Sequence, residues 1–281
     1  MSYQTFDLSL EGHIAHLQLS RPEKYNSLNQ AFWREFPEAI SALDGAAKAR
    51  ALVISGKGKH FSAGMDLEVF SKPDPDMFNG EAGRRAEAMR RLVMQLQTCL
   101  SVLEEVRMPV MTAIQGGCIG GALDMVCASD MRYCTEDAYF VIKETELGMT
   151  ADLGTLQRLP QLISSGLARE LAFSARKLPA REACSAGLVN QVFADQHEML
   201  SGVMEIAQRI AIQSPLAVTG SKQMINYSRD PSMADSLNYM ATWQAGMLQP
   251  TDMMQTFAAK MAGKPPEFEP LRAIKPPLSD N

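Results

Sequence analysis

The 281-residue sequence lacks the patterns that mark several classes of protein. Its five cysteines form no CxxC pair and its four histidines form no HExxH motif, so the spacing argues against the common zinc sites. No apolar run approaches the roughly 18 residues that suggest a membrane span. The net charge of −5, without any block of basic residues, argues against nucleic acids and anionic membranes as partners. A globular enzyme or a small-molecule-binding protein remains.

Recognisable targeting segments are also missing from the printed residues. The first ten residues carry Asp7 and lack a basic segment followed by an apolar one, and the last three, Ser279-Asp280-Asn281, are no peroxisomal signal. An odd number of cysteines at irregular spacing indicates free thiols in a reducing compartment. These features predict a cytoplasmic protein.

Short apolar runs alternate with helical patterns through most of the chain. Buried strands that alternate with helices predict an α/β domain with parallel strands. From residue 154 onward the pattern is mostly helical, and beyond residue 195 it predicts helices alone. We therefore place a boundary between a catalytic core, 1–195, and a helical C-terminal region, 196–281. The predicted elements before residue 154 are a hairpin over 3–20, helices over 30–46, 80–106 and 121–129, and strands over 51–55, 110–114, 131–134 and 139–141.

Two glycine-rich segments follow predicted buried strands. The first glycine segment, residues 60–67, reads HFSAGMDL, and the second, residues 116–121, reads GGCIGG. A glycine turn between a strand and a helix exposes backbone N–H groups at the positive end of the helix dipole, which suits a phosphate or a developing oxyanion. Each segment can equally be a tight turn that needs glycine for its backbone geometry. Neither matches a P-loop or a dinucleotide-binding fingerprint.

Three carboxylates stand near the ends of consecutive predicted elements, beside the second glycine segment. They are Asp124, Glu144 and Asp152. Taken singly, each has a structural explanation: Asp124 can belong to a buried pair, and Asp152 can cap a helix. Together they indicate proton transfer at carbon, because that chemistry needs a positioned acid and base beside donors that stabilise an enolate.

These motifs, in this order, resemble the crotonase superfamily, the enoyl-CoA hydratases and isomerases. The resemblance spans nearly the whole chain. It implies a crotonase-like α/β spiral of ββα turns, a helical C-terminal region that assembles homotrimers or homohexamers, and an acyl-CoA thioester as substrate. The matching segments are Arg21-Pro22 with Asn26-Ser27-Leu28, Phe61–Leu67, Gly116–Asp124, Ala128–Arg132, Glu146–Gly148 and Ala186–Val189.

Within the superfamily, the acidic trio most resembles that of the Δ3,5-Δ2,4-dienoyl-CoA isomerases. Glu144 follows Asp124 by 20 residues and Asp152 follows after 8 more, as in that family, and the run from 152 to 160 is also similar. Typical hydratases carry Glu near position 124 and Gly or Pro where Asp152 stands. The resemblance therefore implies an isomerase of fatty-acid β-oxidation that shifts the double bonds of 3,5-dienoyl-CoA to 2,4-dienoyl-CoA, without a metal or redox cofactor.

The resemblance also implies roles for individual residues. The backbone N–H groups of Met65 and Gly121 would form an oxyanion hole for the thioester carbonyl. Asp152 would remove the proton next to that carbonyl and Glu144 would deliver one at the far end of the diene, although the reverse pairing stays open. Asp124 would tune or orient the pair.

Substrate contacts and two alternative functions complete the predictions. Lys24 is a candidate for binding the CoA phosphates or adenine, and Lys260 for binding a CoA phosphate of its own or of a neighbouring subunit. One alternative is a 2-enoyl-CoA hydratase in which Glu144 activates water. The other is a non-catalytic acyl-CoA-binding protein. The residues implied to line the path of the thioester and pantetheine are Ala63, Gly64, Met65, Asp66, Leu67 and Gly121.

Overall fold

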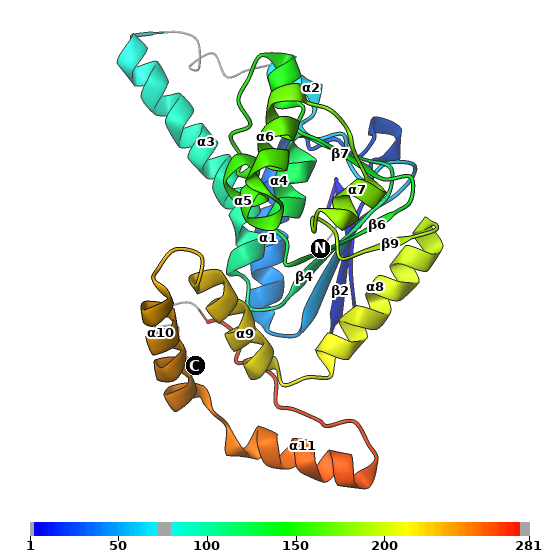
Figure 1. Cartoon of the computed structure of the whole chain (residues 1–281), viewed down its shortest axis with the longest axis vertical. Helices are drawn as coiled ribbons and strands as arrows, with labels where there is room; N and C mark the ends of the chain where they lie inside the picture. The colour runs from blue at the N-terminus through cyan, green and yellow to red at the C-terminus, as the bar shows by residue number, and fades with distance from the viewer. Residues whose placement is uncertain (1–2, 72–79, 276–281) are drawn as a thin grey trace.

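The computed structural model describes residues 3–71 and 80–275 and contains two β-sheets flanked by helices (Figure 1). In the larger sheet only the first pair of strands is antiparallel, and the others are parallel. The larger sheet has the order β1 (Phe6–Glu11), β2 (Ile14–Leu19), β3 (Ala51–Gly56), β4 (Val110–Ile114), β6 (Met131–Thr135) and β9 (Gln191–Phe193). The smaller sheet has the order β5 (Gly117–Ile119), β7 (Tyr139–Val141) and β8 (Leu178–Pro179).

Every residue of β3 and β4 is buried, because helices cover both faces of the sheet at its centre. Successive residues of a strand point to opposite faces. Leu52 and Ile54 accordingly belong to the core that includes helix α1 (Gln30–Ala46), whereas Ala51 and Val53 pack with helix α8 (Gln196–Ala211). This two-sided burial explains why the sequence shows continuous apolar runs instead of alternation.

The predicted hairpin and first helix are confirmed. Gly12, with φ of +57°, makes the turn between β1 and β2, and the side chain of Asn29 caps α1 by accepting from the N–H of Phe32. The other helices that surround the site are α2 (Leu67–Ser71), α3 (Ala82–Glu105), α4 (Gly121–Cys127), α5 (Thr155–Leu162), α6 (Ser165–Ser174) and α7 (Ala180–Ser185), with the 3₁₀ turns η1 (Pro22–Lys24) and η3 (Glu144–Leu147).

Three short strands are absent from the sequence prediction. β5 lies inside the second glycine segment, β8 pairs with β7, and β9 extends the larger sheet beside β6. Each has only two or three residues, which is too short for hydrophobic periodicity to signal. Their partners, distant in sequence, determine that they become strands; two of them, β8 and β9, lie in the stretch between residues 154 and 195 that the sequence predicts to be mostly helical.

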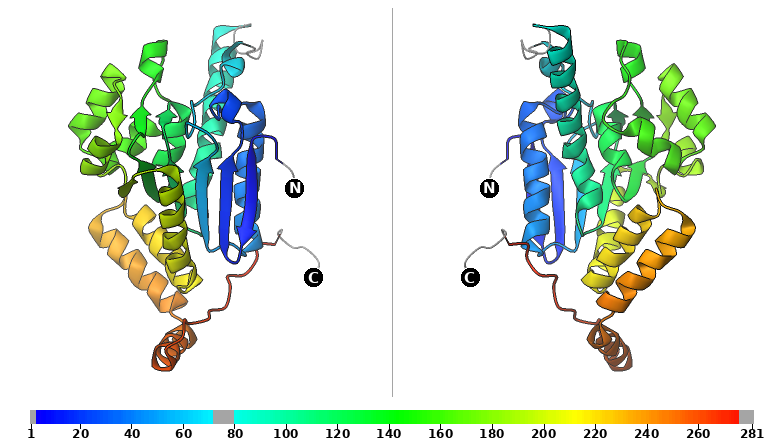
Figure 2. Two further views of the ribbon diagram at one scale, coloured as in Figure 1. Left: turned by 90° about the vertical axis from the view of Figure 1, so that its right-hand side faces the viewer. Right: turned by 90° about the vertical axis from the view of Figure 1, so that its left-hand side faces the viewer.

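The C-terminal region contains the helices that the sequence predicts: α8, α9 (Pro215–Tyr227), α10 (Met233–Met247) and α11 (Pro250–Ala262). Helix α8 lies along the sheet, α10 packs beside α9, and α11 projects from the lower end of the molecule (Figure 2). Neither α10 nor α11 buries a residue. The division at residue 195 stays a prediction. Within the described ranges, no helix is long and apolar enough to cross a membrane.

Candidate active site

The loop that follows β2 holds the first glycine segment in place. The buried side chain of Asn26 donates to the backbone carbonyl of His60 at 2.9 Å, and the Ser62 hydroxyl donates to the carbonyl of Asn26 at 2.8 Å. The N–H of Leu28 donates to the carbonyl of Gly64 at 2.8 Å. These hydrogen bonds explain why the motif around residue 26 accompanies the glycine segment: the two loops form one structural unit.

Asp66, predicted to line the substrate path, has its carboxylate occupied by groups of the protein. It accepts hydrogen bonds from the Ser27 hydroxyl at 2.7 Å and from the Arg21 guanidinium at 3.2 Å, and a third from the backbone N–H of Glu68. Burial by itself would raise the pKa of Asp66, but these donors outweigh it and leave the pKa below its usual value. The side chain of Asp66 therefore fixes the loop, and its neighbour Leu67 is exposed.

Two backbone N–H groups meet where the glycine segments touch. Gly64 has φ of +82°, and a Cβ placed on it would lie 2.4 Å from the carbonyl oxygen of Ile119 and 3.2 Å from the nitrogen of Gly121. A Cβ on Gly121 would lie 3.6 Å from the nitrogen of Met65. Within the described part of the chain, neither the Met65 nor the Gly121 N–H donates a hydrogen bond. Glycine thus permits a close approach that leaves two free donors at the start of α4.

Asp124 lies inside α4 and is only 1% exposed. Its Oδ1 accepts the backbone N–H of Thr155, the first residue of α5, at 2.6 Å. Burial raises the pKa of Asp124 to about 6, with a contribution from the negative charge of Asp152, against the opposing effects of the Thr155 hydrogen bonds and the Arg158 charge. The residue that precedes α5 is Gly154, which has no side chain to cap the helix. The carboxylate of Asp124 therefore accepts the first backbone N–H of α5 in its place.

Glu144 begins η3, and Ile142 and Lys143 separate it from the strand β7. It is half-buried, and a Cβ on Gly120 would lie 3.0 Å from its Oε1, so the carboxylate sits against the second glycine segment. Burial raises the pKa of Glu144 to about 7, and the charges of Asp124 and Asp152 raise it further in the same direction. A carboxyl group with such a pKa can hold a proton near neutral pH and release it.

Asp152 is an exposed residue in the segment that leads into α5. Partial burial raises the pKa of its carboxyl. Asp152 acts electrostatically on both Asp124 and Glu144, so the structure brings the three predicted carboxylates together. Clustered carboxylates with raised pKa values are typical of sites that move protons. Such an arrangement, beside two free N–H donors, can transfer a proton along a substrate whose carbonyl oxygen the donors bind.

The remaining candidate residues lie elsewhere or have structural contacts. Lys24 is exposed in η1, and Lys260 is exposed in α11, at the opposite end of the molecule from α4 (Figure 1). The Nδ1 atom of His60 accepts the N–H of Gly117 at 2.9 Å. Cys118 is fully buried, which raises the pKa of its thiol well above the usual value. The described residues contain no group of three His, Cys, Asp or Glu side chains that could hold a metal ion.

The sequence analysis missed two side chains that contact the segment around Asp152. The Gln97 amide donates to the backbone carbonyl of Asp152 at 2.6 Å, and the Arg158 guanidinium donates to the carbonyl of Leu153 at 3.3 Å. The only sequence feature that could have pointed to Arg158 is the run from 152 to 160, which contains it and resembles the isomerase family. No local pattern could link Gln97, on α3, to a loop 55 residues away.

The pKa of Asp124 leads to a prediction about stability. A folded-state pKa of about 6, above the usual value of 3.8 for an aspartate, means that folding disfavours the ionised form, so stability declines as the pH rises from about 4 to 6. At about 1.4 kcal/mol per pKa unit, the cost at neutral pH is roughly 3 kcal/mol. We expect Asp124→Asn, which keeps an acceptor for the Thr155 N–H, to raise the melting temperature by about 5 °C at pH 8.

Thermal unfolding at two pH values tests this expectation. The difference between Asp124→Asn and the wild type should be large at pH 8 and small at pH 4.5, where Asp124 is protonated in the wild type. A variant that melts below the wild type at pH 8 would show that the ionised carboxylate stabilises the fold. Asp124→Asn should also be less active than the wild type, since residues that serve function often destabilise the fold.

Several known proteins are similar to this chain in sequence or in structure. A family model described as enoyl-CoA hydratase/isomerase matches residues 9–264. The mitochondrial Δ3,5-Δ2,4-dienoyl-CoA isomerase of Mus musculus is 46% identical over 254 residues, which cover 90% of this chain and 78% of that protein. The peroxisomal isomerase of Arabidopsis thaliana is 41% identical over 274 residues, or 96% and 99% of the two chains. The crystal structure of an enoyl-CoA hydratase from Bacillus anthracis superposes with a TM-score of 0.85 at 28% identity, covering 94% and 99%. This similarity confirms the predicted crotonase-like fold.

The predicted cytoplasmic location is contradicted by the same comparison. The isomerases from Mus musculus and Arabidopsis thaliana are named as mitochondrial and peroxisomal proteins. The prediction relied on the absence of a recognisable targeting segment. Receptors read such signals from short peptides, independently of the folded domain, so composition and fold carry little information about the compartment.

Proposed function

Because the chain belongs to the enoyl-CoA hydratase/isomerase family, we propose that it converts 3,5-dienoyl-CoA into 2,4-dienoyl-CoA in fatty-acid β-oxidation. The observation that carries this proposal is the cluster of Asp124, Glu144 and Asp152, all with raised pKa values, beside the free N–H groups of Met65 and Gly121. The identity of 46% and 41% with named dienoyl-CoA isomerases supports it.

The proposed reaction moves one proton along the substrate. Asp152 removes a proton from the carbon next to the thioester carbonyl, and the electron pair of that bond delocalises over the diene as an enolate. Glu144 then delivers a proton to the sixth carbon, which leaves double bonds at positions 2 and 4. The pKa of Glu144 of about 7 supports its assignment as the acid, because it is protonated in a large part of the molecules near neutral pH.

The two free donors have the role of an oxyanion hole in this proposal. As the carbonyl oxygen gains enolate charge, the N–H groups of Met65 and Gly121 bind it more strongly than they bind the neutral ground state. The position of Gly121 at the start of α4 adds the positive end of the helix dipole. Asp124, tied to the N–H of Thr155, holds the start of α5 and its own charge in a fixed place beside the acid and the base.

The same site defines the expected ligands. Isomerisation moves a proton and leaves the oxidation state of the substrate unchanged, so the reaction as written balances without a redox cofactor or a metal. The backbone from Ala63 to Leu67, together with Gly121, would line the path of the thioester and pantetheine. Lys24 and Lys260 remain the proposed contacts for CoA; from its position in α11, Lys260 would serve a neighbouring subunit.

We further propose that α10 and α11 assemble the chain into a homotrimer or homohexamer. These helices bury no residue of their own and expose large apolar side chains: Met233, Leu237, Met254, Phe257 and Met261 are each more than 60% exposed. A monomer rarely exposes so many apolar side chains together, and a second copy of the chain would cover them. Light scattering of the purified protein distinguishes monomer, trimer and hexamer by mass.

A spectrophotometric assay tests the proposed activity. Purified protein given 3,5-octadienoyl-CoA should produce the absorbance of the conjugated 2,4-dienoyl product. Addition of water to crotonyl-CoA, with no isomerisation of the diene, would favour the hydratase instead. Binding of both thioesters without turnover of either would favour a non-catalytic acyl-CoA-binding protein.

The pH dependence of the reaction follows from the raised pKa values. The base Asp152 must be ionised and the acid Glu144 protonated, so kcat should rise with pH through an acidic limb and fall through a basic limb with an apparent pKa near 7. Because the three carboxylates interact, both limbs belong to the cluster. Measuring kcat in Glu144→Gln should show a lower rate without the basic limb; a basic limb that persists would assign it to another group.

A further inference from the structure

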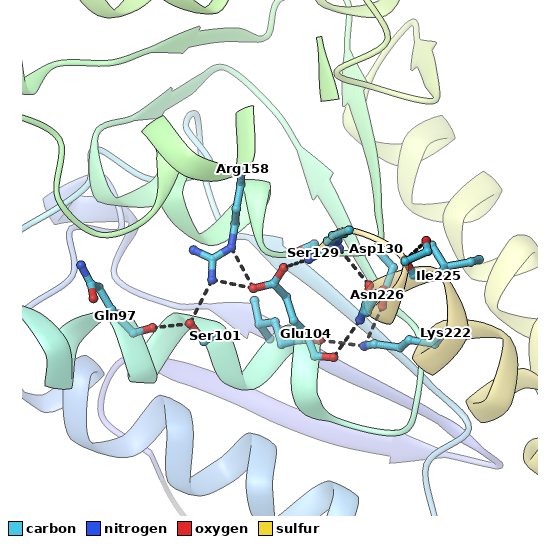
Figure 3. Close-up of polar contacts among 12 residues, drawn as sticks. Gln97, Ser101, Glu104, Ser129, Asp130, Arg158, Lys222, Ile225 and Asn226 are labelled. Atoms are coloured by element: carbon cyan, nitrogen blue, oxygen red, sulfur yellow. Dashed lines mark hydrogen bonds and ion pairs between the residues drawn. The ribbon is translucent and has the colours of Figure 1, made fainter. Parts of the chain in front are cut away.

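A polar network connects α3 to α5, the helix that follows the segment with Asp152 (Figure 3). Gln97, Ser101 and Glu104 are four and three residues apart, so they lie along one face of α3. The guanidinium of Arg158, from α5, reaches this face. Its Nε and Nη2 donate to Oε2 of Glu104 at 2.8 and 2.5 Å, and Nη2 also donates to the Ser101 hydroxyl at 2.9 Å.

The same face of α3 holds the backbone just before α5. Arg158 Nη1 donates to the carbonyl of Leu153 at 3.3 Å, and the Gln97 amide donates to the carbonyl of Asp152 at 2.6 Å. Gly154 follows with φ of +123°, and a Cβ on it would lie 1.9 Å from Arg158 Nη1. The guanidinium therefore occupies the space that a side chain at residue 154 would fill, and it lies directly against the segment that carries Asp152.

Two of the three carboxylates depend on this segment. Asp152 belongs to it, and Asp124 is bonded to the N–H of Thr155, three residues before Arg158. The ion pair between Arg158 and Glu104 is mostly shielded from solvent, with side chains 16% and 17% exposed. A guanidinium that makes several hydrogen bonds in a fixed fork defines position as well as charge.

We propose that Arg158, held by Glu104, is a positioning residue that fixes Asp152 for proton transfer; this inference rests on the proposed isomerase function. Arg158 acts through the carbonyl of Leu153 and the start of α5, and it does not touch the substrate. Its planar fork spans Glu104, Ser101 and Leu153 at once, which a lysine ammonium, as a single point, cannot reproduce. A displacement of the base by about 1 Å can cost on the order of a hundredfold in rate.

Glu104 also provides a matched control. Its other oxygen, Oε1, pairs with Arg229 near the end of α9, and Asn226 donates to its backbone carbonyl at 3.1 Å. Arg229 thus pairs with the same carboxylate as Arg158, while the other hydrogen bond of its guanidinium goes to the side chain of Asn226 on α9. If the network served stability alone, both arginines would matter in the same way.

The test compares Arg158→Gln, Arg158→Lys and Arg229→Gln with the wild type on 3,5-octadienoyl-CoA. We expect Arg158→Gln to lower kcat by roughly 30-fold, with KM within about threefold, because a misplaced base affects the chemical step more than binding. Arg158→Lys should also lose activity, by about tenfold, since it keeps the charge and loses the fork. Arg229→Gln should keep kcat within about twofold, as is usual for exposed pairs.

The pH profile separates positioning from a merely structural role. Removing the positive charge in Arg158→Gln should move the acidic limb of kcat to higher pH, because the Arg158 charge lowers the pKa of Asp124, one of the three interacting carboxylates to which that limb belongs. Arg158→Lys should leave that limb in place. If Arg158→Gln fails to fold, Glu104→Gln takes its place. That variant should lower kcat about fivefold. The loss is smaller than in Arg158→Gln because Ser101 and Leu153 still hold the guanidinium, and it is larger than in Arg229→Gln because the ion pair of Arg158 is gone.

The results distinguish a failure of the proposed function from a failure of the positioning role. A wild type without diene isomerisation overturns the proposed function, and the role of Arg158 with it. An active wild type with unchanged kcat and pH profile in Arg158→Gln overturns the positioning role alone. The positioning role is also overturned if Arg229→Gln loses as much kcat as Arg158→Lys does, or as much as Glu104→Gln does. Either result would show that the network only supports the fold.

Discussion

Replacing Asp152 by asparagine is expected to lower kcat for 3,5-octadienoyl-CoA by about a thousandfold, since a general base contributes roughly 10² to 10⁴ in rate. Asparagine has the same shape but cannot accept the proton from the carbon next to the carbonyl. Because Asp152 is exposed, the fold should tolerate the substitution. KM should move little, because the side chain acts on the proton and not on the CoA part of the substrate. Initial rates over a range of substrate concentrations measure both quantities.

The matched control for this substitution is Asp230→Asn. Asp230 is an exposed carboxylate beyond the end of α9, outside the site, and its replacement removes the same charge. Both variants should melt within a degree or two of the wild type, and only Asp152→Asn should lose isomerisation. Wild-type turnover in Asp152→Asn would show that another group removes the proton, and the proposed mechanism would then be wrong.

Replacing Gly64 by alanine is expected to lower kcat by about a hundredfold or more, the usual effect of losing one oxyanion donor. The new Cβ would lie 2.4 Å from the carbonyl oxygen of Ile119, and the φ of +82° is unfavourable for alanine. The two glycine segments must therefore separate, which moves the N–H of Met65 away from that of Gly121. The loss should appear in kcat more than in KM, because the donors bind the enolate more tightly than the ground state.

Gly166→Ala is the matched control for the glycine substitution. Gly166 lies in α6 with no atom within 4 Å of the added Cβ, so alanine should be neutral or slightly stabilising there. Gly64→Ala should itself lower the melting temperature, so its rate must be taken at a temperature where circular dichroism shows it fully folded. If folded Gly64→Ala keeps the wild-type kcat, the contact between the two segments does not shape the oxyanion site.

The local elements of this protein follow from its sequence because neighbouring residues specify them. The Asn29 cap and the apolar spacing that follows define α1, and the alternation on either side of Gly12 defines the first hairpin. Continuous apolar runs predict the central strands, since a strand buried on both faces has no polar side. The ordered motifs, together with the spacing of the acidic trio, carry the resemblance to the dienoyl-CoA isomerases, and the comparisons support that resemblance.

The site itself depends on contacts between residues far apart in the chain. The approach of Gly64 to Gly121, the bond from Thr155 to Asp124 and the clamp of Arg158 on Glu104 join positions 31 to 57 residues apart. Local periodicity carries no information about such pairs. The pKa values of the carboxylates likewise depend on burial and on neighbouring charges, and both exist only after the chain has folded. The sequence alone determines which residue types are available for proton transfer. Their proximity and their pKa values, which the reaction also requires, are decided by tertiary packing.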